Sequence, residues 1–380
     1  MAAFTRSSLR SLATRRRVLA GATTAGALGL AIGGFAGDLS NGVAPSVHTA
    51  RRTTPADRLP IEGTLPSLAG ATAWFNSAPL TPAGLKGKTV LVQFWTYTCI
   101  NWRRQFPYVR AWVEKYRNEG LVVIGVHTPE FDFEHDVENV RRAAKEIGVT
   151  FPIAVDSGHA IWDAFNNEAW PALYFVDTQG RIRHRFYGEG DYDQSEHIIQ
   201  QLLTEVGAQG VNHDLASVRA DGAEVAADWR NLKSPESYLG YDQAENFASP
   251  GGALVGRPRD YTVPDGLQRN QWGLSGDWTV ENRAVMLNGS NGRIRYRFHA
   301  RDVNLVLAPP ANGRPARFRV AIDGTTLDDA LGVDAKTEGW GTVDQPRLYQ
   351  LIRQIGPIVD RTFEIEFFDP GVRAYDFTFG

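Results

Sequence analysis

The sequence has very little cysteine: Cys99 is the only one among 380 residues. A single cysteine excludes a disulfide within the chain and a cysteine-rich zinc site. A strong net charge is also absent, because 40 Lys and Arg against 43 Asp and Glu leave a formal charge of -3. This balance argues against a nucleic-acid partner, which requires a basic surface. The 43% hydrophobic and 22% charged residues are typical of a soluble globular chain, here long enough for two domains.

The N-terminus has the composition of an export signal. Residues 1–17 contain five arginines and no acid, and an uncharged run rich in Ala, Gly, Leu and Thr follows from Val18 to Ala36. The string TRRRVL (residues 14–19) resembles a twin-arginine signal. A single membrane anchor would also fit the length of the run, and cleavage stays open. We predict a signal over residues 1–40, a flexible tether over 41–58, and an exported, periplasmic or extracytoplasmic protein that is membrane-tethered if the signal is uncleaved.

From residue 59 the pattern becomes that of an α/β domain. Three apolar runs and a hairpin predict the strands, and helical spacing of apolar residues predicts three helices, the first interrupted by Pro107. The predicted strands are Thr89–Trp95, Leu121–Val126, Ile153–Val155, Ala172–Val176 and Arg181–Phe186, and the predicted helices are Ile100–Glu119, Glu134–Ile147 and Gln194–Val206. The order β-α-β-α-β-β-α predicts a sheet with helices on both faces over residues 59–207.

Cys99 lies between a predicted buried strand and a predicted helix. Unpaired N–H groups at a helix start favour a negative charge, and Arg103 and Arg104 follow one turn later. Both effects are expected to lower the pKa of the thiol, and the thiolate is the reactive form. The alternative is an inert cysteine that packs as a small hydrophobe. The polar neighbours Thr98 and Asn101 favour the reactive interpretation.

Five strings resemble the thioredoxin-like redoxins of the TlpA and AhpC/TSA type, and most closely the C-terminal periplasmic region of DipZ-type cytochrome c biogenesis and thiol–disulfide exchange proteins. They are VLVQFWTYTCINW (90–102), GVHTPEF (125–131), FPIAVD (151–156), AWPALYFVDTQG (169–180) and GEGDYDQSE (188–196). The resemblance implies a thioredoxin-like fold and a thiol–disulfide oxidoreductase with Cys99 as its nucleophile. It also implies protein thiols or disulfides and an external reductant as partners.

The same resemblance implies which residues surround the thiol. Thr96 and Thr98 belong to the active-site motif, and Pro171 occupies the place of a cis-proline that faces the catalytic cysteine, preceded by Trp170. A cis X-Pro bond leaves backbone groups that can pair with an extended substrate. An ordinary strand-edge proline is the alternative.

The motif departs from the family at its second cysteine. Relatives carry Cys-x-x-Cys, whereas this chain has Trp102 in the second place, so the resolving attack on a mixed disulfide is missing. Gln93 occupies the place of the acid found in thioredoxins proper. Three functions follow: monothiol exchange resolved by an external thiol, a degenerate binding module for protein or glycan, or a one-cysteine peroxidase. Thr96 matches the peroxidase motif, but Val92 replaces its proline.

The remaining chain predicts a linker over 208–235 and an all-β domain over 236–380. Short alternating runs separated by Asn-Gly and Asp-Gly turns predict an antiparallel sandwich or jelly roll, similar to carbohydrate-binding modules. The runs are Ala284–Leu287, Ile294–His299, Val303–Leu307, Arg317–Ile322, Arg347–Ile352, Phe363–Phe368 and Ala374–Phe379. The strings ENFASP, LSGDWTV, NGRIRYRFHARDVNLVL and DRTFEIEFFDPG also resemble the domain that follows the redoxin domain in DipZ-type proteins.

Two ligand classes receive little support from the sequence. Trp272, Trp278 and Trp340 offer stacking faces for a sugar, but core packing accounts for at least two of them. His127, Glu134 and His135 show no repeated ligand spacing, so we predict solvated or structural roles, no metal and no cofactor.

Overall fold

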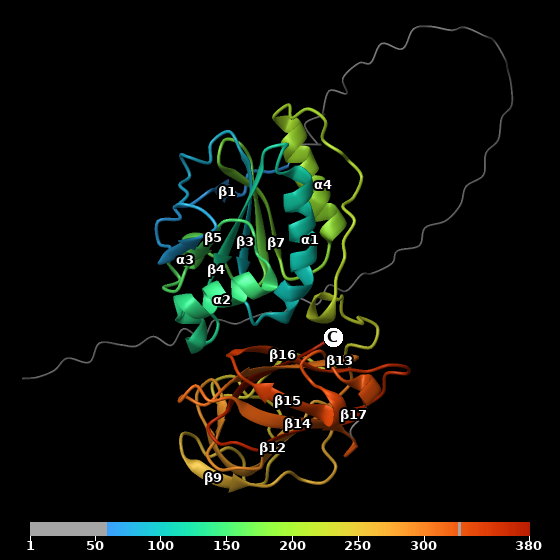
Figure 1. Ribbon diagram of the computed structural model, residues 1–380. Coiled ribbons are helices and arrows are strands. Elements are labelled where there is room, and N and C mark those ends of the chain that lie inside the picture. The colour runs from blue at the N-terminus through green and yellow to red at the C-terminus, as the bar shows by residue number, and fades with distance from the viewer. Residues whose placement is uncertain (1–58, 326–327) are drawn as a thin grey trace, which may run out of the picture. The chain divides into compact units, whose positions relative to one another are not determined.

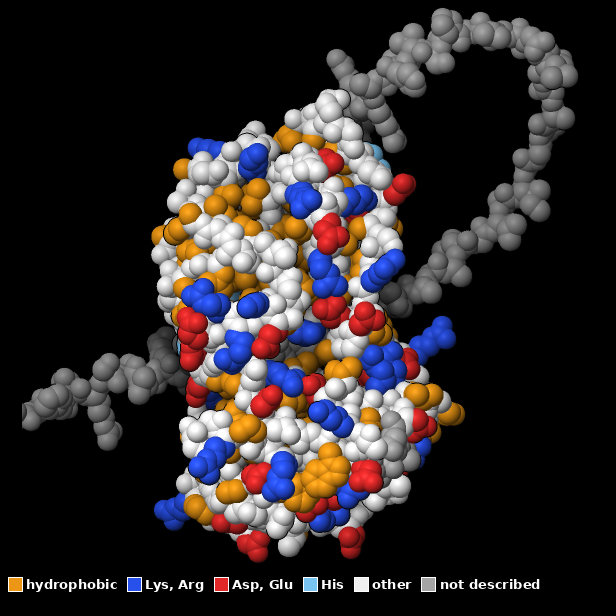
Figure 2. All heavy atoms as spheres, in the orientation of Figure 1, with side chains coloured by type: hydrophobic (Ala, Val, Ile, Leu, Met, Phe, Trp, Pro, Cys, Tyr) orange, Lys and Arg blue, Asp and Glu red, His pale blue; other side chains and the backbone are white. Residues whose placement is uncertain are grey.

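The computed structural model describes residues 59–325 and 328–380. The signal and tether predicted over residues 1–40 and 41–58 lie outside these described residues. Residues 62–380 form one compact unit. Among the described residues, no helix is both long and apolar enough to span a membrane. On the face shown in Figure 2, acidic and basic side chains are interspersed, as the nearly neutral net charge predicts.

The first domain is a thioredoxin-like α/β domain built on a seven-stranded sheet in the order β1-β7-β6-β3-β4-β5-β2 (Figure 1). Its strands are β1 (Gly63–Thr64), β2 (Ala73–Phe75), β3 (Thr89–Trp95), β4 (Leu121–His127), β5 (Ile153–Val155), β6 (Ala172–Val176) and β7 (Arg181–Tyr187). Its helices are α1 (Ile100–Tyr116), the short 3-10 turn η2 (Asp132–His135), α2 (Val137–Ile147), α3 (Ala160–Ala164) and α4 (Tyr192–Glu205). Strands β3, β4 and β5 are parallel, and β6 returns antiparallel to β3.

Strand β3 is the middle strand of the sheet, and every one of its residues is buried. Successive side chains point to opposite faces. Val92 belongs to the apolar cluster on one face, which includes Ile161 of α3, while Trp95 contacts Trp102 of α1 on the other. Helices α1 and α4 lie side by side along the sheet (Figure 1), where Trp112 Nε1 donates a hydrogen bond to Glu196 at 3.0 Å. Both faces of the sheet are therefore covered.

The predicted strands of this domain are confirmed to within a residue. The apolar runs of β3, β5 and β6 are buried at every position. Strand β7 is only partly buried and was predicted from its place in the hairpin. The first helix continues through Pro107 and ends at Tyr116, three residues before the predicted end. The second predicted helix was placed too early. Its N-cap is Asp136, whose side chain accepts a hydrogen bond from Glu138 N. The sequence analysis did not find β1, β2 and α3.

The second domain is all-β, a curled antiparallel sheet in the order β15-β14-β17-β12-β10-β11-β18-β13-β16, with β9 paired to β10 and β8 to β18. Its strands are β8 (Ser237–Tyr238), β9 (Pro258–Tyr261), β10 (Trp272–Val280), β11 (Val285–Leu287), β12 (Gly292–Phe298), β13 (Asp302–Ala308), β14 (Ala316–Ile322), β15 (Trp340–Val343), β16 (Arg347–Arg353), β17 (Arg361–Phe367) and β18 (Arg373–Phe379). Short 3-10 turns are η4 (Asp328–Ala330) and η5 (Thr337–Gly339).

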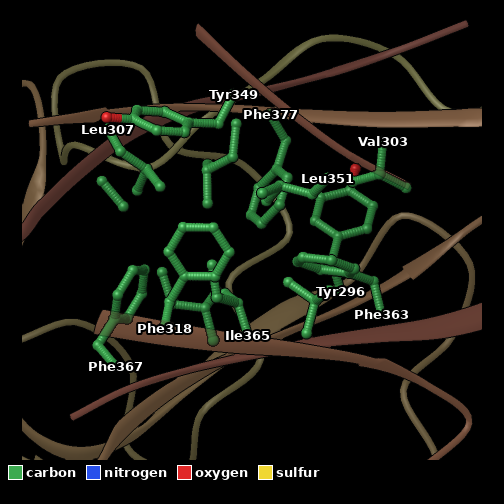
Figure 3. Packing of buried hydrophobic residues seen from close by; sticks show 14 of the residues in the cluster. Tyr296, Val303, Leu307, Phe318, Tyr349, Leu351, Phe363, Ile365, Phe367 and Phe377 are labelled. Carbon is green, nitrogen blue, oxygen red and sulfur yellow. The ribbon is translucent and has the colours of Figure 1, made fainter. Parts of the chain in front are cut away.

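The sheet curls at β10, whose first half pairs with β12 and whose second half pairs with β9 and β11. The two halves of the sheet thereby face each other around one core. Figure 3 shows Phe318 and Ile365 on one side of this core and Tyr349 and Leu351 on the other. The seven predicted strands are confirmed, and β8, β9, β10 and β15 are additional. The predicted sandwich-like domain is therefore present.

The tryptophans considered as sugar platforms have different positions in this domain. Trp272 and Trp278 are 1% and 0% exposed and belong to the core, so they offer no stacking face. Trp340 is 37% exposed, and its ring contacts Phe368 and the Arg319 guanidinium.

The segment predicted as a linker is folded against the first domain at several points. It contains the short turn η3 (Gly222–Glu224). Glu224 forms an ion pair with Arg110 of α1 at 3.1 Å, and Ala216 N donates a hydrogen bond to Glu196 of α4 at 3.0 Å.

Candidate active site around Cys99

Cys99 is the N-cap residue of α1 and follows the end of β3 by four residues. Its backbone N–H donates to Thr96 O at 3.2 Å, and its carbonyl accepts from Arg103 N at 3.0 Å. Thr96 is buried, whereas the cysteine is partly exposed. A tight turn after a fully buried strand thus presents the thiol at the carboxyl end of the central strands.

Pro171 lies at the same edge of the sheet as Cys99. Strand β6 runs antiparallel to β3 with Ala172 opposite Phe94, so Pro171 precedes the residue that pairs near the end of β3. The Trp170–Pro171 peptide bond is cis, which confirms the sequence prediction. Pro171 O accepts a hydrogen bond from Gly188 N at 2.7 Å. Trp170 is half-buried and packs on Trp162, with ring centroids 4.2 Å apart.

Trp102 is completely buried in the first turn of α1. Its indole stacks on Trp95 with a centroid separation of 4.3 Å and an interplanar angle of 25°, and it contacts Phe106 at 5.3 Å. The position that the family resemblance assigns to the resolving cysteine is therefore an aromatic core position in this chain. No sulfur other than that of Cys99 is available for an internal disulfide.

The buried polar side chain on β3 that faces α1 is the neutral amide of Gln93. Gln93 is buried, and its Nε2 donates to Gln105 Oε1 at 2.7 Å, while Gln105 Nε2 donates to Gly188 O at 3.1 Å. This amide pair links β3, α1 and the start of the 188–191 loop. Because neither side chain ionises, Gln93 supplies no base for proton transfer at this position.

A buried carboxylate holds the turn that carries the thiol. Glu134 Oε1 accepts from Thr98 Oγ1 at 2.7 Å and from Thr98 N at 3.3 Å, and its Oε2 accepts from Glu130 N and Phe131 N at 2.8 and 2.9 Å. Burial raises the pKa of Glu134, and the hydrogen bonds from Thr98 and the Phe131 N–H oppose this rise. The structural role predicted for Glu134 is confirmed, although it is buried and not solvated.

His127 is likewise an internal residue. It is completely buried at the end of β4, where its ring stacks on Tyr97 at 5.5 Å and meets Trp95 edge-on at 4.9 Å. Burial lowers the pKa of His127 to about 3, so the imidazole is neutral. Within residues 59–325 and 328–380, no three His, Cys, Asp or Glu side chains form a cluster that could hold a metal ion.

The two arginines after the thiol have other partners. Arg104 is buried, forms an ion pair with Glu189 at 3.2 Å, and donates from Nη2 to Phe379 O at 2.9 Å. Burial lowers the pKa of Arg103, and the nearby Glu224 and Asp334 oppose this effect. The expectation that both arginines lower the pKa of Cys99 is therefore not supported, because the strongest influences on that thiol come from other groups.

The pKa of Cys99 is raised, so the prediction of a lowered value is wrong. Burial by the surrounding protein is the largest cause, and the negative charges of Glu130 and Glu236 add to it. The N–H groups of Trp102 and Asn101 at the helix start act in the predicted direction and lower the pKa, but their effect is smaller than the rise caused by burial. The prediction considered the helix start and the two arginines, whereas desolvation decides the direction of the shift.

The second domain contributes to the surroundings of the thiol, which the sequence analysis did not foresee. Ile100 and Phe131 share an apolar cluster with residues of β13, β16 and β18. The rings of Phe131 and Phe133 contact Tyr375 at 5.2 and 5.0 Å. Tyr238 of β8 donates from its hydroxyl to Glu130 Oε1 at 2.6 Å. Residues next to the thiol in sequence are thus packed against segments of the second domain that are distant in sequence.

The family models agree with this architecture. The Redoxin model matches residues 63–203, and the model described as a thioredoxin like C-terminal domain matches residues 234–380. The chain belongs to the thioredoxin-like redoxin family, whose members include proteins named thiol–disulfide oxidoreductases.

Two relatives illustrate the extent of the similarity. Protein DipZ of Mycobacterium tuberculosis is 35% identical over 281 residues, which are 71% of this chain and 39% of DipZ. Thiol-disulfide oxidoreductase YkuV of Bacillus subtilis is 33% identical over 141 residues, 37% of this chain and 95% of YkuV. The matched region is thus well under half of DipZ. A solution structure of a thioredoxin-like protein in the oxidized form is 35% identical, with a TM-score of 0.35, and covers 38% of this chain and 96% of that one.

Proposed function

We propose that this protein is an exported thiol–disulfide oxidoreductase that acts through one nucleophilic thiol, Cys99. The single observation that carries the proposal is the complete burial of Trp102 against Trp95, one helical turn from the thiol. The place of the second cysteine is thereby occupied by a core side chain, while Cys99 remains partly exposed at the edge of the sheet where the cis-proline Pro171 also lies.

The reaction is a monothiol exchange. After Cys99 loses its proton to solvent, the thiolate attacks one sulfur of a protein disulfide, forms a mixed disulfide, and releases the other sulfur as a thiolate that takes up a proton. With no second thiol in the chain, an external thiol attacks the mixed disulfide and restores the Cys99 thiol. Protein thiols and disulfides and an external reductant are therefore the proposed partners, as the name of YkuV indicates for that relative.

We propose supporting roles for the neighbouring residues. Pro171 and Trp170 form the edge on which an extended substrate backbone pairs. Thr96 and Thr98 hold the turn, through the hydrogen bond to Cys99 N and through Glu134 respectively. Arg104 is a structural residue that joins α1 to Phe379 of β18.

The raised pKa of Cys99 favours a second candidate, a thioredoxin-fold module that binds proteins without exchange. Both exchange and a one-cysteine peroxidase require the thiolate, so the raised pKa of Cys99 slows either reaction at neutral pH. A glycan is not among the proposed ligands of the β domain, because Trp272 and Trp278 belong to the core.

Trapping in extracts distinguishes exchange from binding. Full-length protein is incubated with extracts of its source cells, free thiols are then blocked, and the attached proteins are identified on non-reducing gels. We expect adducts that a reductant releases and that Cys99→Ser does not form. If the wild-type protein and Cys99→Ser capture the same proteins in the same amounts, capture does not depend on the thiol, and exchange would be contradicted.

Export rests on the Arg15–Arg16 pair and the weakly apolar run after it. We propose the twin-arginine route and the domain limits 59–207, 208–235 and 236–380. Replacing both arginines by lysine should retain the protein inside the cytoplasmic membrane. Unchanged export of that variant would exclude this route.

A further inference from the structure

A cleft formed by residues of both domains takes no part in the exchange reaction. Its volume is about 740 Å³, which is in the range of ligand sites in proteins, about 300–1,000 Å³. The first domain contributes η2 to the lining. The β domain contributes β10, the turn between β10 and β11, and the start of β18. The cleft therefore exists only where the two domains meet.

The lining of the cleft is held by contacts within and between the domains. On the side of the β domain, Tyr241 N donates to Glu281 O at 3.0 Å, and Gly256 N donates to Val280 O at 2.8 Å. The ring of Phe133 in η2 packs edge-on against that of Tyr375 in β18, with centroids 5.0 Å apart. This aromatic contact makes the lining continuous across the two domains.

Three aromatic rings line the cleft, those of Phe133, Tyr241 and Tyr375. Tyr241 is 43% exposed, whereas Tyr375 is only 8% exposed. Even so, the hydroxyl of Tyr375 forms no hydrogen bond with any residue that the structure describes. Because a polar group with so little access to water is costly to leave unpaired, this hydroxyl is suited to bind a ligand in the cleft.

The charges that line the cleft do not cancel. Arg373 donates to both carboxylate oxygens of Glu281, from Nε at 2.9 Å and from Nη2 at 3.4 Å, so this pair is neutral. Asp132 also lines the cleft and is exposed, and its carboxylate has no ion pair or hydrogen bond within residues 59–325 and 328–380. One negative charge therefore remains without a counterion.

The same charges act on the unpaired hydroxyl. Burial raises the pKa of Tyr375 to about 12, Arg373 opposes this rise, and the carboxylates of Glu281 and Asp132 add to it. The hydroxyl and the charged side chains thus belong to one site. A cation is the ligand that such a site favours, since it is attracted both by a carboxylate and by the faces of aromatic rings.

We propose that this cleft binds a lysine or arginine side chain of a polypeptide partner, with the cationic group beside Asp132 and the aromatic rings. The volume of the cleft exceeds that of one such side chain, so the neighbouring residues of an extended segment also fit, which favours a polypeptide over a free amine. The site is a second binding surface that goes beyond the proposed function, and no residue of the exchange reaction lines it.

Fluorescence anisotropy with short cysteine-free peptides tests the proposal on the reduced full-length protein. The labelled probe is the amide of Gly-Ser-Arg-Arg-Ser-Gly, and the comparison peptides carry citrulline or glutamate in place of arginine. Citrulline has the shape of arginine without its charge, so the ratio of the two affinities isolates the cation. At low ionic strength we expect the arginine peptide to bind about tenfold more tightly than the citrulline peptide, and by less at higher salt. The glutamate peptide should bind most weakly.

Variants of the lining locate the source of the preference. Asp132→Asn and Tyr241→Ala should each lower the ratio of arginine to citrulline affinity by about threefold, through loss of the carboxylate charge and of one ring face respectively. Both side chains are exposed, so neither change disturbs the core, and urea midpoints check the folding. Asp193→Asn, at an exposed position of α4 outside the cleft, is the matched control and should change nothing.

The outcomes decide both the site and its occupant. Equal affinity for the arginine and citrulline peptides, or a preference that is unchanged in Asp132→Asn and Tyr241→Ala, overturns the proposal. We expect spermidine to displace the labelled peptide only at concentrations well above those of the unlabelled peptide. Displacement at equal or lower concentrations would assign the cleft to free amines and overturn the polypeptide as its occupant. Because the peptides contain no sulfur, these results do not depend on whether Cys99 exchanges disulfides.

Discussion

Restoring a second cysteine at position 102 tests whether the active-site turn is arranged as the family fold implies. In Trp102→Cys, two thiols one helical turn apart should form a disulfide and gain dithiol reductase activity. Trp102 is 0% exposed and stacks on Trp95, so the exchange removes a fully buried indole.

The magnitudes predict a destabilised but folded variant. Truncation of a buried aromatic side chain costs about 3–5 kcal/mol of unfolding free energy, and loss of the stacking contact is part of that cost. Closure of a four-residue loop by a disulfide returns about 2 kcal/mol in the chain-entropy model. Relative to wild type, the oxidised variant should therefore lose about 1–3 kcal/mol, which a domain of ordinary stability tolerates.

The assay combines urea unfolding of both redox forms with insulin reduction by a dithiol reductant. Cys99→Ser in the Trp102→Cys background is the matched control, because it keeps the cavity and removes the partner thiol. We expect turnover and a redox-dependent midpoint in the variant alone. A folded Trp102→Cys protein that forms no disulfide under oxidising conditions would refute the assigned geometry.

Further predictions concern charge and domain contact. Glu130→Gln should shift the pH profile of Cys99 alkylation to lower pH, since the removed charge raises the pKa of the thiol; an unchanged profile would count against this. Burial raises the pKa of Glu189 to about 7, so its carboxyl binds a proton more readily in the folded state and the unfolding free energy should fall by up to about 3 kcal/mol between pH 4.5 and 7. In Glu189→Gln the unfolding free energy, measured by urea titration at several pH values, should not show this fall. The same pH dependence in both proteins would contradict the assignment. Arg104→Met should cost about 3–5 kcal/mol above pH 8, where Glu189 is ionised and loses its cation; a thermal shift below one degree at that pH would be inconsistent with this.

The fold was largely predictable because its elements carry strong local signals. Thr89–Trp95 reads as a buried strand, and it is buried at every position. Strand β10 was missed because glycines, a serine and an aspartate interrupt its apolar pattern where the strand passes from one half of the sheet to the other. The late start of α2 is set by the cap at Asp136, which competes with helical spacing.

The electrostatics of the site were not predictable in the same way. The partners of Arg104 are Glu189 and the carbonyl of Phe379, 85 and 275 residues away. Likewise, no local pattern indicates that Glu236 is near Cys99. The helix start gave the correct position of the thiol, but the sign of its pKa shift depends on desolvation by segments that meet only in the folded chain.

The central claim is that Cys99 is a single exchange thiol without an internal partner. Intact-mass spectrometry of reduced full-length protein treated with hydroxyethyl disulfide at mildly alkaline pH tests it most directly. We expect one mixed disulfide per folded chain, located on Cys99, that persists after removal of the reagent and disappears on addition of an external thiol. A folded chain that acquires no adduct, while the urea-unfolded chain is fully modified, would contradict it.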